Sequence, residues 1–253
     1  MDFQIVKQIA VNNWPMFLRG AWVTLYISII STIIGTMIGF VVGVVKTAPK
    51  PKKLLGRIIL KTVKIIFDIY VEVTRGTPMM VQAMVFFYGM PLLLGIDIPP
   101  FASSLIIVSV NTGAYMAEIV RGGIISIDKG QFEAFDALGM NHVQGMLYVI
   151  LPQVLRNILP ATGNEFVINI KDTSVLNVIQ VTELYFQTKS IAGANFRYFE
   201  SFLITMVIYL VMTFTVTRIL RMIEKKLDGP ANFIMSGNQM QVVVPEVKPL
   251  ERE

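Results

Sequence analysis

The sequence predicts an all-α membrane protein with five transmembrane helices, and three observations support this fold class. Hydrophobic residues make up 54% of the 253 positions, and the mean hydropathy is +0.62. Apolar runs of about 18 residues or more, the length at which a helix can cross a bilayer, recur along the chain. The net charge of +5 comes from lysines and arginines beside those runs, which favours a role in membrane orientation over nucleic-acid binding.

The first span is expected at residues 21–45, after a lead-in. Residues 1–20 are weakly apolar and are interrupted by Asn12, Asn13 and Pro15, which indicates an extracytoplasmic or interfacial segment. Within the span, small residues recur every three or four positions and therefore share one helix face: Thr24, Ser28, Ser31, Gly35, Gly39 and Gly43. Small residues let a second helix approach closely inside a bilayer. The pattern predicts a tightly packed span.

A basic loop, an amphipathic helix and the second span follow. The loop at residues 46–53 holds four lysines and two prolines. Residues 54–73 place charged and apolar side chains on opposite faces, which is typical of a helix at the cytoplasmic membrane surface. The sequence Thr74–Pro78 breaks this helix, and its proline can open the second span at 78–95. Whether residues 54–95 form one kinked helix or two stays open.

The third and fourth spans, expected at residues 101–122 and 156–175, each carry a polar face. The polar residues recur at i, i+4 and i+7: Asn111, Tyr115 and Glu118 on one span, and Glu165, Asn169 and Asp172 on the other. A carboxylate within the hydrocarbon region costs about 2.5–3.5 kcal/mol on insertion scales, so these groups need a partner, an interfacial position or water. Glu118 can pair with Arg121, three residues on, and this keeps a structural role open for it.

Glu165 lies deeper in its span and has no evident basic partner in the sequence. It is therefore the best candidate for a group that lines a water-filled path. A carboxylate there can meet an ammonium or guanidinium group of a passing solute. The candidate residues of the path are Asn111, Tyr115, Asn164, Glu165 and Asn169.

The fifth span is expected at residues 198–223 and completes a transmembrane domain at 21–228, which a cytoplasmic tail at 229–253 follows. Seventeen of the 22 lysines and arginines lie in three segments on one side of the membrane: 46–75, 121–156 and 218–253. By the positive-inside rule that side is cytoplasmic. The N-terminus is then outside the cell membrane and the C-terminus inside.

Residues 130–152 form a polar island between two apolar spans, on the side that the charges assign to the cytoplasm. They predict a helix from Gln131 to Leu138, a stop at Gly139, and a second helix that Pro152 ends or kinks. Two short helices at an angle form a protrusion to which another protein can bind. An ordinary cytoplasmic helix-turn-helix is the plainer alternative.

This segment resembles the EAA loop of ATP-binding-cassette import permeases. The pattern is Glu-Ala-Ala, a glycine four residues on, then nine residues and Ile-x-Leu-Pro. Phe135 stands at its third position and Val149 replaces the isoleucine; the matching residues are Glu133, Ala134, Gly139, Leu151 and Pro152. The resemblance implies a coupling loop that docks an ATPase subunit. Its residues are then Glu133, Ala134, Leu138, Gly139, Leu151 and Pro152.

Other stretches resemble the polar amino acid permeases of this superfamily. These are Leu18–Gly20 with Thr24-Leu25, Tyr70–Glu72 with Thr74–Pro78, Tyr115 with Glu118-Ile119 and Arg121–Ile124, and Lys171–Ser174 with Glu183-Leu184. The resemblance implies the type I importer permease architecture in a bacterial cytoplasmic membrane. It also implies a second permease subunit (identical or homologous), two cytoplasmic ATP-binding subunits, an extracytoplasmic solute-binding protein and import of a polar amino acid by alternating access.

Composition argues against an enzyme. The chain has no cysteine and a single histidine, His142. The sequence therefore lacks the ligands of a cysteine-based zinc site, a thiolate nucleophile and a histidine cluster. A Gly-rich loop ending in Gly-Lys-Ser/Thr is absent from the sequence, so ATP and magnesium are expected on the partner subunit and no cofactor or metal on this one. The alternatives left open are a permease for another small solute, such as an osmolyte, and a non-transporting membrane scaffold.

Overall fold

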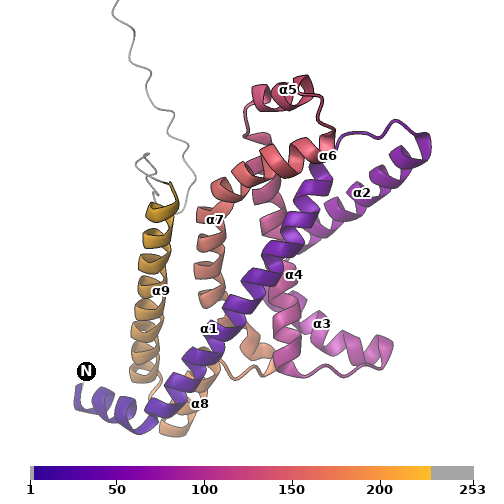
Figure 1. Ribbon diagram of the computed structural model, residues 1–253. Coiled ribbons are helices and arrows are strands. Elements are labelled where there is room, and N and C mark those ends of the chain that lie inside the picture. Colours follow the sequence, from indigo (N-terminus) through magenta and orange to yellow (C-terminus); the bar gives the residue numbers. More distant parts are fainter. Residues whose placement is uncertain (1–2, 229–253) are drawn as a thin grey trace, which may run out of the picture.

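The computed structural model describes residues 3–228, which form helices joined by short connections (Figure 1). In chain order the elements are α1 Phe3–Thr47, α2 Leu54–Gly76, α3 Met79–Leu94, α4 Pro100–Ile125, α5 Lys129–Ala137, α6 His142–Gly145, the π-helical turn η1 Met146–Ile150, α7 Leu151–Asp172, the 3₁₀ segment η2 Thr173–Ile179, α8 Leu184–Asn195 and α9 Tyr198–Asp228. The bundle is elongated, with α5 and α6 at one end and α8 at the other. The tail expected at 229–253 lies outside the described residues.

α1 and α4 form the central pair of the bundle, and the predicted small-residue face of α1 is confirmed as their contact. A β-carbon added at Gly35 would lie 2.6 Å from Thr112 Cβ, and one added at Gly43 would lie 2.7 Å from Val120 Cβ. Both separations are shorter than non-bonded carbons tolerate. The glycines therefore set how closely the two helices approach, as small residues do in membrane bundles.

α1 also includes the region that the sequence assigned to a separate lead-in. The helix begins at Phe3 and continues through Pro15. Its first turns lie across the bottom of Figure 1 and the remainder rises diagonally, a bend of the kind that an internal proline produces. Ile9 and Phe17 are buried beside Leu184 of α8, so the lead-in is helical because it packs on the far end of the bundle.

Residues 54–95 form two helices rather than one. The chain is extended at Thr77 and Pro78, because Pro78 cannot continue the α2 hydrogen-bond ladder. The Tyr70 hydroxyl donates to the Val110 carbonyl of α4 at 2.6 Å. Since Val110 lies near the middle of α4, the C-terminal part of α2 reaches the centre of the bundle and does not stay at one surface.

The Gly130–Pro152 segment follows the predicted pattern with shifted bounds. Asp128 caps α5, its side chain accepting from the Gly130 amide at 2.7 Å. Gly139 has φ +71°, the left-handed conformation in which a glycine ends a helix. Pro152 follows η1 without a break in helical conformation, since Ile150 and Leu151 are both αR. Because its ring nitrogen cannot donate to the preceding turn, the helical path bends at η1 just before it (Figure 1).

The expectation of five apolar spans is met only in part. Among residues 3–228, the helices long and apolar enough to cross a membrane are three, at Phe3–Thr47, Pro100–Ile125 and Tyr198–Lys226. The second expected span, α3, is apolar but has only 16 residues. The fourth, α7, is long enough but carries too many polar side chains, Glu165 and Asn169 among them, on the face turned into the bundle.

Candidate functional site

One aromatic side chain is buried between the two short helices of the Gly130–Pro152 segment. Phe135 of α5 is 3% exposed, and its ring lies where a side chain at position 145 would be. A β-carbon added at Gly145 would lie 2.5 Å from Phe135 Cδ2. The departure from the EAA pattern at position 135 is therefore accommodated by the glycine that follows on α6. α5 packs against α6 through this contact.

Phe135 also packs against the apolar core of the bundle. Phe135 belongs to an apolar cluster that also contains Val120 and Ile124 of α4 and Val154 and Ile158 of α7. Close packing of this kind transmits displacement, because protein interiors contain few voids. A force applied to α5 is thus carried to both helices that bear the polar faces.

The outer surface of the segment exposes part of the predicted coupling set. Glu133, Ala134, Gly139 and Pro152 are exposed, and Leu138 is 79% exposed. Leu151 is 8% exposed and belongs to the apolar cluster, so its side chain supports the segment from within.

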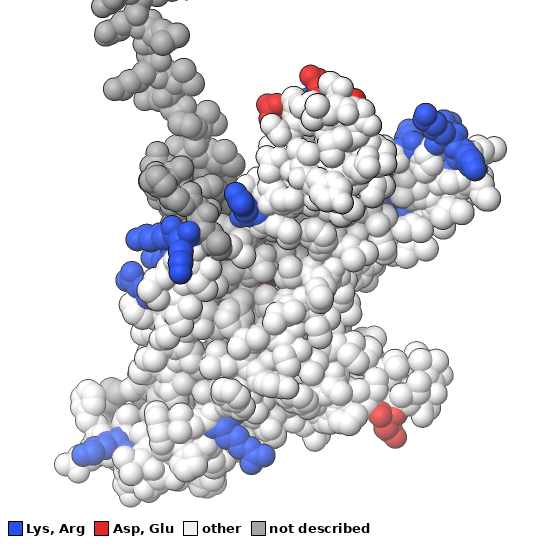
Figure 2. All heavy atoms as spheres, in the orientation of Figure 1, with Lys and Arg blue, Asp and Glu red and all other residues white. Residues whose placement is uncertain are grey.

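Three further apolar side chains of the same segment are exposed, and sequence reasoning missed them. Val143 is 64%, Leu147 is 54% and Tyr148 is 74% exposed. Acidic side chains occupy the tip of the segment in Figure 2. The outer surface therefore combines an acidic tip with protruding apolar groups, as a docking surface for another protein does.

Asn169 of α7 connects three helices through side-chain hydrogen bonds. Its amide nitrogen lies 2.9 Å from Thr32 Oγ1 of α1 and 2.9 Å from Thr112 Oγ1 of α4. Asn169 and both threonines are buried. Buried hydrogen bonds of this kind fix the relative position of the helices that they join. Asn169 therefore stabilises the arrangement of α1, α4 and α7 around the polar region.

The break between α2 and α3 places Gln82 of α3 beside Asn111 of α4. The Gln82 side chain donates to the Thr74 carbonyl at 2.7 Å and accepts from the Asn111 amide at 3.2 Å. The Arg75 guanidinium lies 5.3 Å from the centre of the Tyr115 ring. Arg75 and Gln82 were not expected from the sequence, although a Gly-Pro interruption within an apolar region is a recognised sign of a site in transporters.

Glu165 lies inside the bundle at 9% exposure. Asn164 beside it is exposed, and Arg75 and Asp172 are the charged groups within electrostatic range of the Glu165 carboxylate. The Arg75 side chain also lies over Tyr115. The Arg75 guanidinium therefore lies over an aromatic ring of α4 and within electrostatic range of a carboxylate of α7, and Asp172 brings a second carboxylate into the same range.

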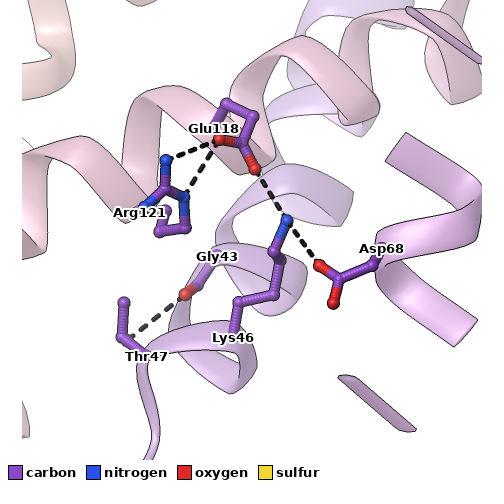
Figure 3. A network of polar contacts seen from close by, with 6 residues as sticks. All are labelled: Gly43, Lys46, Thr47, Asp68, Glu118 and Arg121. Carbon is purple, nitrogen blue, oxygen red and sulfur yellow. Dashed lines mark hydrogen bonds and ion pairs between the residues drawn. The ribbon is translucent and has the colours of Figure 1, made fainter. Parts of the chain in front are cut away.

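Glu118 of α4 has a structural role. Its carboxylate accepts from Arg121 Nη2 at 2.8 Å, the pair expected from the sequence, and from Lys46 Nζ at 2.7 Å (Figure 3). The same Lys46 nitrogen lies 2.9 Å from Asp68 Oδ1 of α2. One lysine at the end of α1 therefore holds α2 and α4 together, and its partners lie far from it in the sequence.

Comparison with known proteins shows the family of the chain. A family model described as binding-protein-dependent transport system inner membrane component matches residues 35–229. The glutamine transport system permease protein GlnP of Escherichia coli K12 is 39% identical over 214 residues, covering 84% of this chain and 93% of that protein. The L-cystine transport system permease protein TcyB of Bacillus subtilis 168 is 32% identical over 229 residues, covering 90% and 92%.

A solved structure shares the fold. The crystal structure of an amino acid ABC transporter with histidines superposes with a TM-score of 0.76 at 35% identity, covering 90% of this chain and 99% of the solved one. The family match and the relatives confirm the permease family that the residues predicted. The chain belongs to the family of inner membrane components of binding-protein-dependent transport systems, and it is a permease subunit of an ATP-binding-cassette importer, with ATP hydrolysis carried out by separate subunits.

Proposed function

We propose that this permease imports a polar amino acid across the bacterial cytoplasmic membrane by ATP-driven alternating access. The observation that carries the proposal is the continuous apolar packing from α5 through Phe135 to α4 and α7. Closure of an ATPase dimer pushes on the exposed surface of the Gly130–Pro152 segment, and this packing turns the push into a tilt of the two helices with polar faces.

The proposed solute class rests on the charges of Arg75 on α2 and Glu165 on α7, which lie within electrostatic range of each other. Arg75 is suited to the carboxylate of an amino acid and Glu165 to its ammonium group. Asn111, Tyr115 and Asn164 complete the proposed path, and Asn169 holds its wall. The names of the relatives, which transport glutamine and L-cystine, support a polar amino acid.

The proposed assembly has two permease subunits, two cytoplasmic ATP-binding subunits that hold ATP and magnesium, and an extracytoplasmic solute-binding protein. Five crossings are proposed, made by α1, by α2 and α3 in succession, and by α4, α7 and α9. The distribution of lysine and arginine supports an N-terminus outside and a cytoplasmic C-terminus.

The test is to purify the chain with its co-purifying partners and measure ATP hydrolysis against a panel of amino acids and osmolytes. We expect one or a few polar amino acids to stimulate hydrolysis and osmolytes such as betaine to leave it unchanged. Stimulation by osmolytes alone would identify a different importer. Co-purification without any ATPase subunit would support a scaffold.

A further inference from the structure

The stretch between α1 and the middle of α2 is strongly basic, and the proposed function does not use it. Residues 46–67 contain seven lysines and arginines and no acidic residue. Lys46 pairs with Asp68 and Glu118, and Lys64 donates to the Ala48 carbonyl at 2.8 Å. The four remaining lysines are exposed and have no ion-pair partner among the side chains described at residues 3–226; we call them the basic cluster: Lys50, Lys52, Lys53 and Lys61.

Exposed apolar side chains lie among these cations. Leu54 is 73% and Leu55 is 69% exposed, and one turn further Ile58 and Ile59 are 56% and 55% exposed. Lysine stems can lie along such a surface while the ammonium groups reach past it. A helix face with aliphatic groups bordered by lysines is the pattern of a helix at the membrane interface.

The charges of the surrounding surface favour lipid over protein as the occupant. Figure 2 shows basic groups of the α1–α2 loop and the start of α2 projecting to one side, at the same end of the molecule as the Gly130–Pro152 segment. That segment has an acidic tip, so the two surfaces differ in sign and do not form one continuous docking face. Aliphatic groups beside unpaired cations match the acyl chains and phosphate of an anionic lipid.

We propose that the basic cluster binds the headgroups of anionic phospholipids, whose acyl chains cover Leu54, Leu55, Ile58 and Ile59. Phosphatidylglycerol therefore occupies this surface in preference to phosphatidylcholine. The bound lipid screens the mutual repulsion of the lysines and holds the N-terminal turns of α2, of which only the C-terminal part is buried against other helices.

The test uses the full chain in nanodiscs with one tryptophan reporter. The two native tryptophans, Trp14 and Trp22, are replaced by phenylalanine, and Leu55→Trp is introduced at the proposed acyl surface. Quenching of the reporter is measured with brominated phosphatidylglycerol against brominated phosphatidylcholine. The neutralised variant carries Gln at the four positions of the basic cluster, and Lys225→Gln/Lys226→Gln removes two exposed lysines at the end of α9 as the matched control.

We expect a preference for phosphatidylglycerol of about fivefold or more, since each lysine near an anionic surface contributes about this factor. The preference falls close to one in the neutralised variant, persists in the control, and persists with inorganic phosphate in the buffer. Raising the salt to about 1 M also weakens it in the parent, which tests the proposal even if the neutralised variant does not fold.

Equal quenching by both lipids in the parent, or a preference that survives neutralisation or high salt, would overturn the proposal. Loss of the preference in inorganic phosphate would show that the cluster binds free anions instead. Absence of quenching by either lipid would show that this face is covered by protein, such as a second copy of the chain.

Discussion

The contact between Phe135 and Gly145 offers the sharpest perturbation of the coupling segment. Gly145→Ala adds a β-carbon 2.5 Å from Phe135 Cδ2 and 2.6 Å from Phe135 Cγ, which forces α5 away from α6. Overpacking a filled core costs typically about 1–3 kcal/mol. If the ATPase subunit binds only the packed arrangement, its affinity for the permease falls by about 5- to 150-fold.

The second substitution, Phe135→Ala, restores the alanine of the EAA pattern. Alone it removes a buried aromatic ring and leaves a cavity, a change that costs about 3–5 kcal/mol in cores generally. Combined with Gly145→Ala, it leaves space for the new methyl group. We expect the double variant to bind the ATPase subunit more tightly than the sum of the two single losses predicts, by about 0.5–3 kcal/mol of coupling energy.

The assay is titration of permease in nanodiscs with the purified ATP-binding subunit, followed by binding, for the parent and three variants. A thermal unfolding curve for each variant separates a local displacement of α5 from global unfolding. If the two losses simply add, or if Gly145→Ala binds as tightly as the parent, the Phe135–Gly145 contact does not set the docking geometry.

Three further predictions concern the bundle. Glu165→Gln keeps the size of the side chain but removes its charge, so transport or solute choice should change while assembly and basal ATP hydrolysis stay nearly intact; normal transport would make Glu165 structural. Lys46→Met leaves Glu118 and Asp68 without their shared cation and should destabilise the fold by on the order of 3 kcal/mol in thermal unfolding. Arg197→Gln should cost less than about 1 kcal/mol, because the Arg197 side chain is half-exposed and lies 3.5 Å from its partner Glu200. Asp97→Cys should be labelled by an impermeant thiol reagent in intact cells and Lys50→Cys should not, on a chain without native cysteine; the reverse labelling would invert the proposed topology.

Local features were readable from the sequence because they depend on neighbours along the chain. The Gly139 helix end, the Glu118–Arg121 pair and the small-residue face of α1 each follow from spacing within one or a few turns, and the structure confirms them. The role of Gly145 was not predictable, because its absent side chain matters only once Phe135 is folded against it.

Long-range pairs and the number of apolar spans were harder to predict. Lys46 and Glu118 are 72 residues apart in the sequence, and nothing local indicates that they meet. From the sequence, Arg75 counts as one of the cytoplasmic charges, because the spacing does not show how deep in the membrane the break at Thr77 and Pro78 lies. The polar face of α7 lowers its hydropathy below that of an isolated span, although its buried side packs within the bundle.

Coupling of ATP hydrolysis to solute movement through the Gly130–Pro152 segment can be measured as the amount of amino acid transported per ATP hydrolysed, in proteoliposomes containing the complete importer. Gly139→Val places a β-branched residue at φ +71°, a conformation costly to side chains of this shape, and should displace the end of α5. We expect this variant to insert into the membrane but to lose transport, with ATP hydrolysis either lost or no longer stimulated by solute. Full transport with normal ATPase binding in Gly139→Val would contradict this coupling.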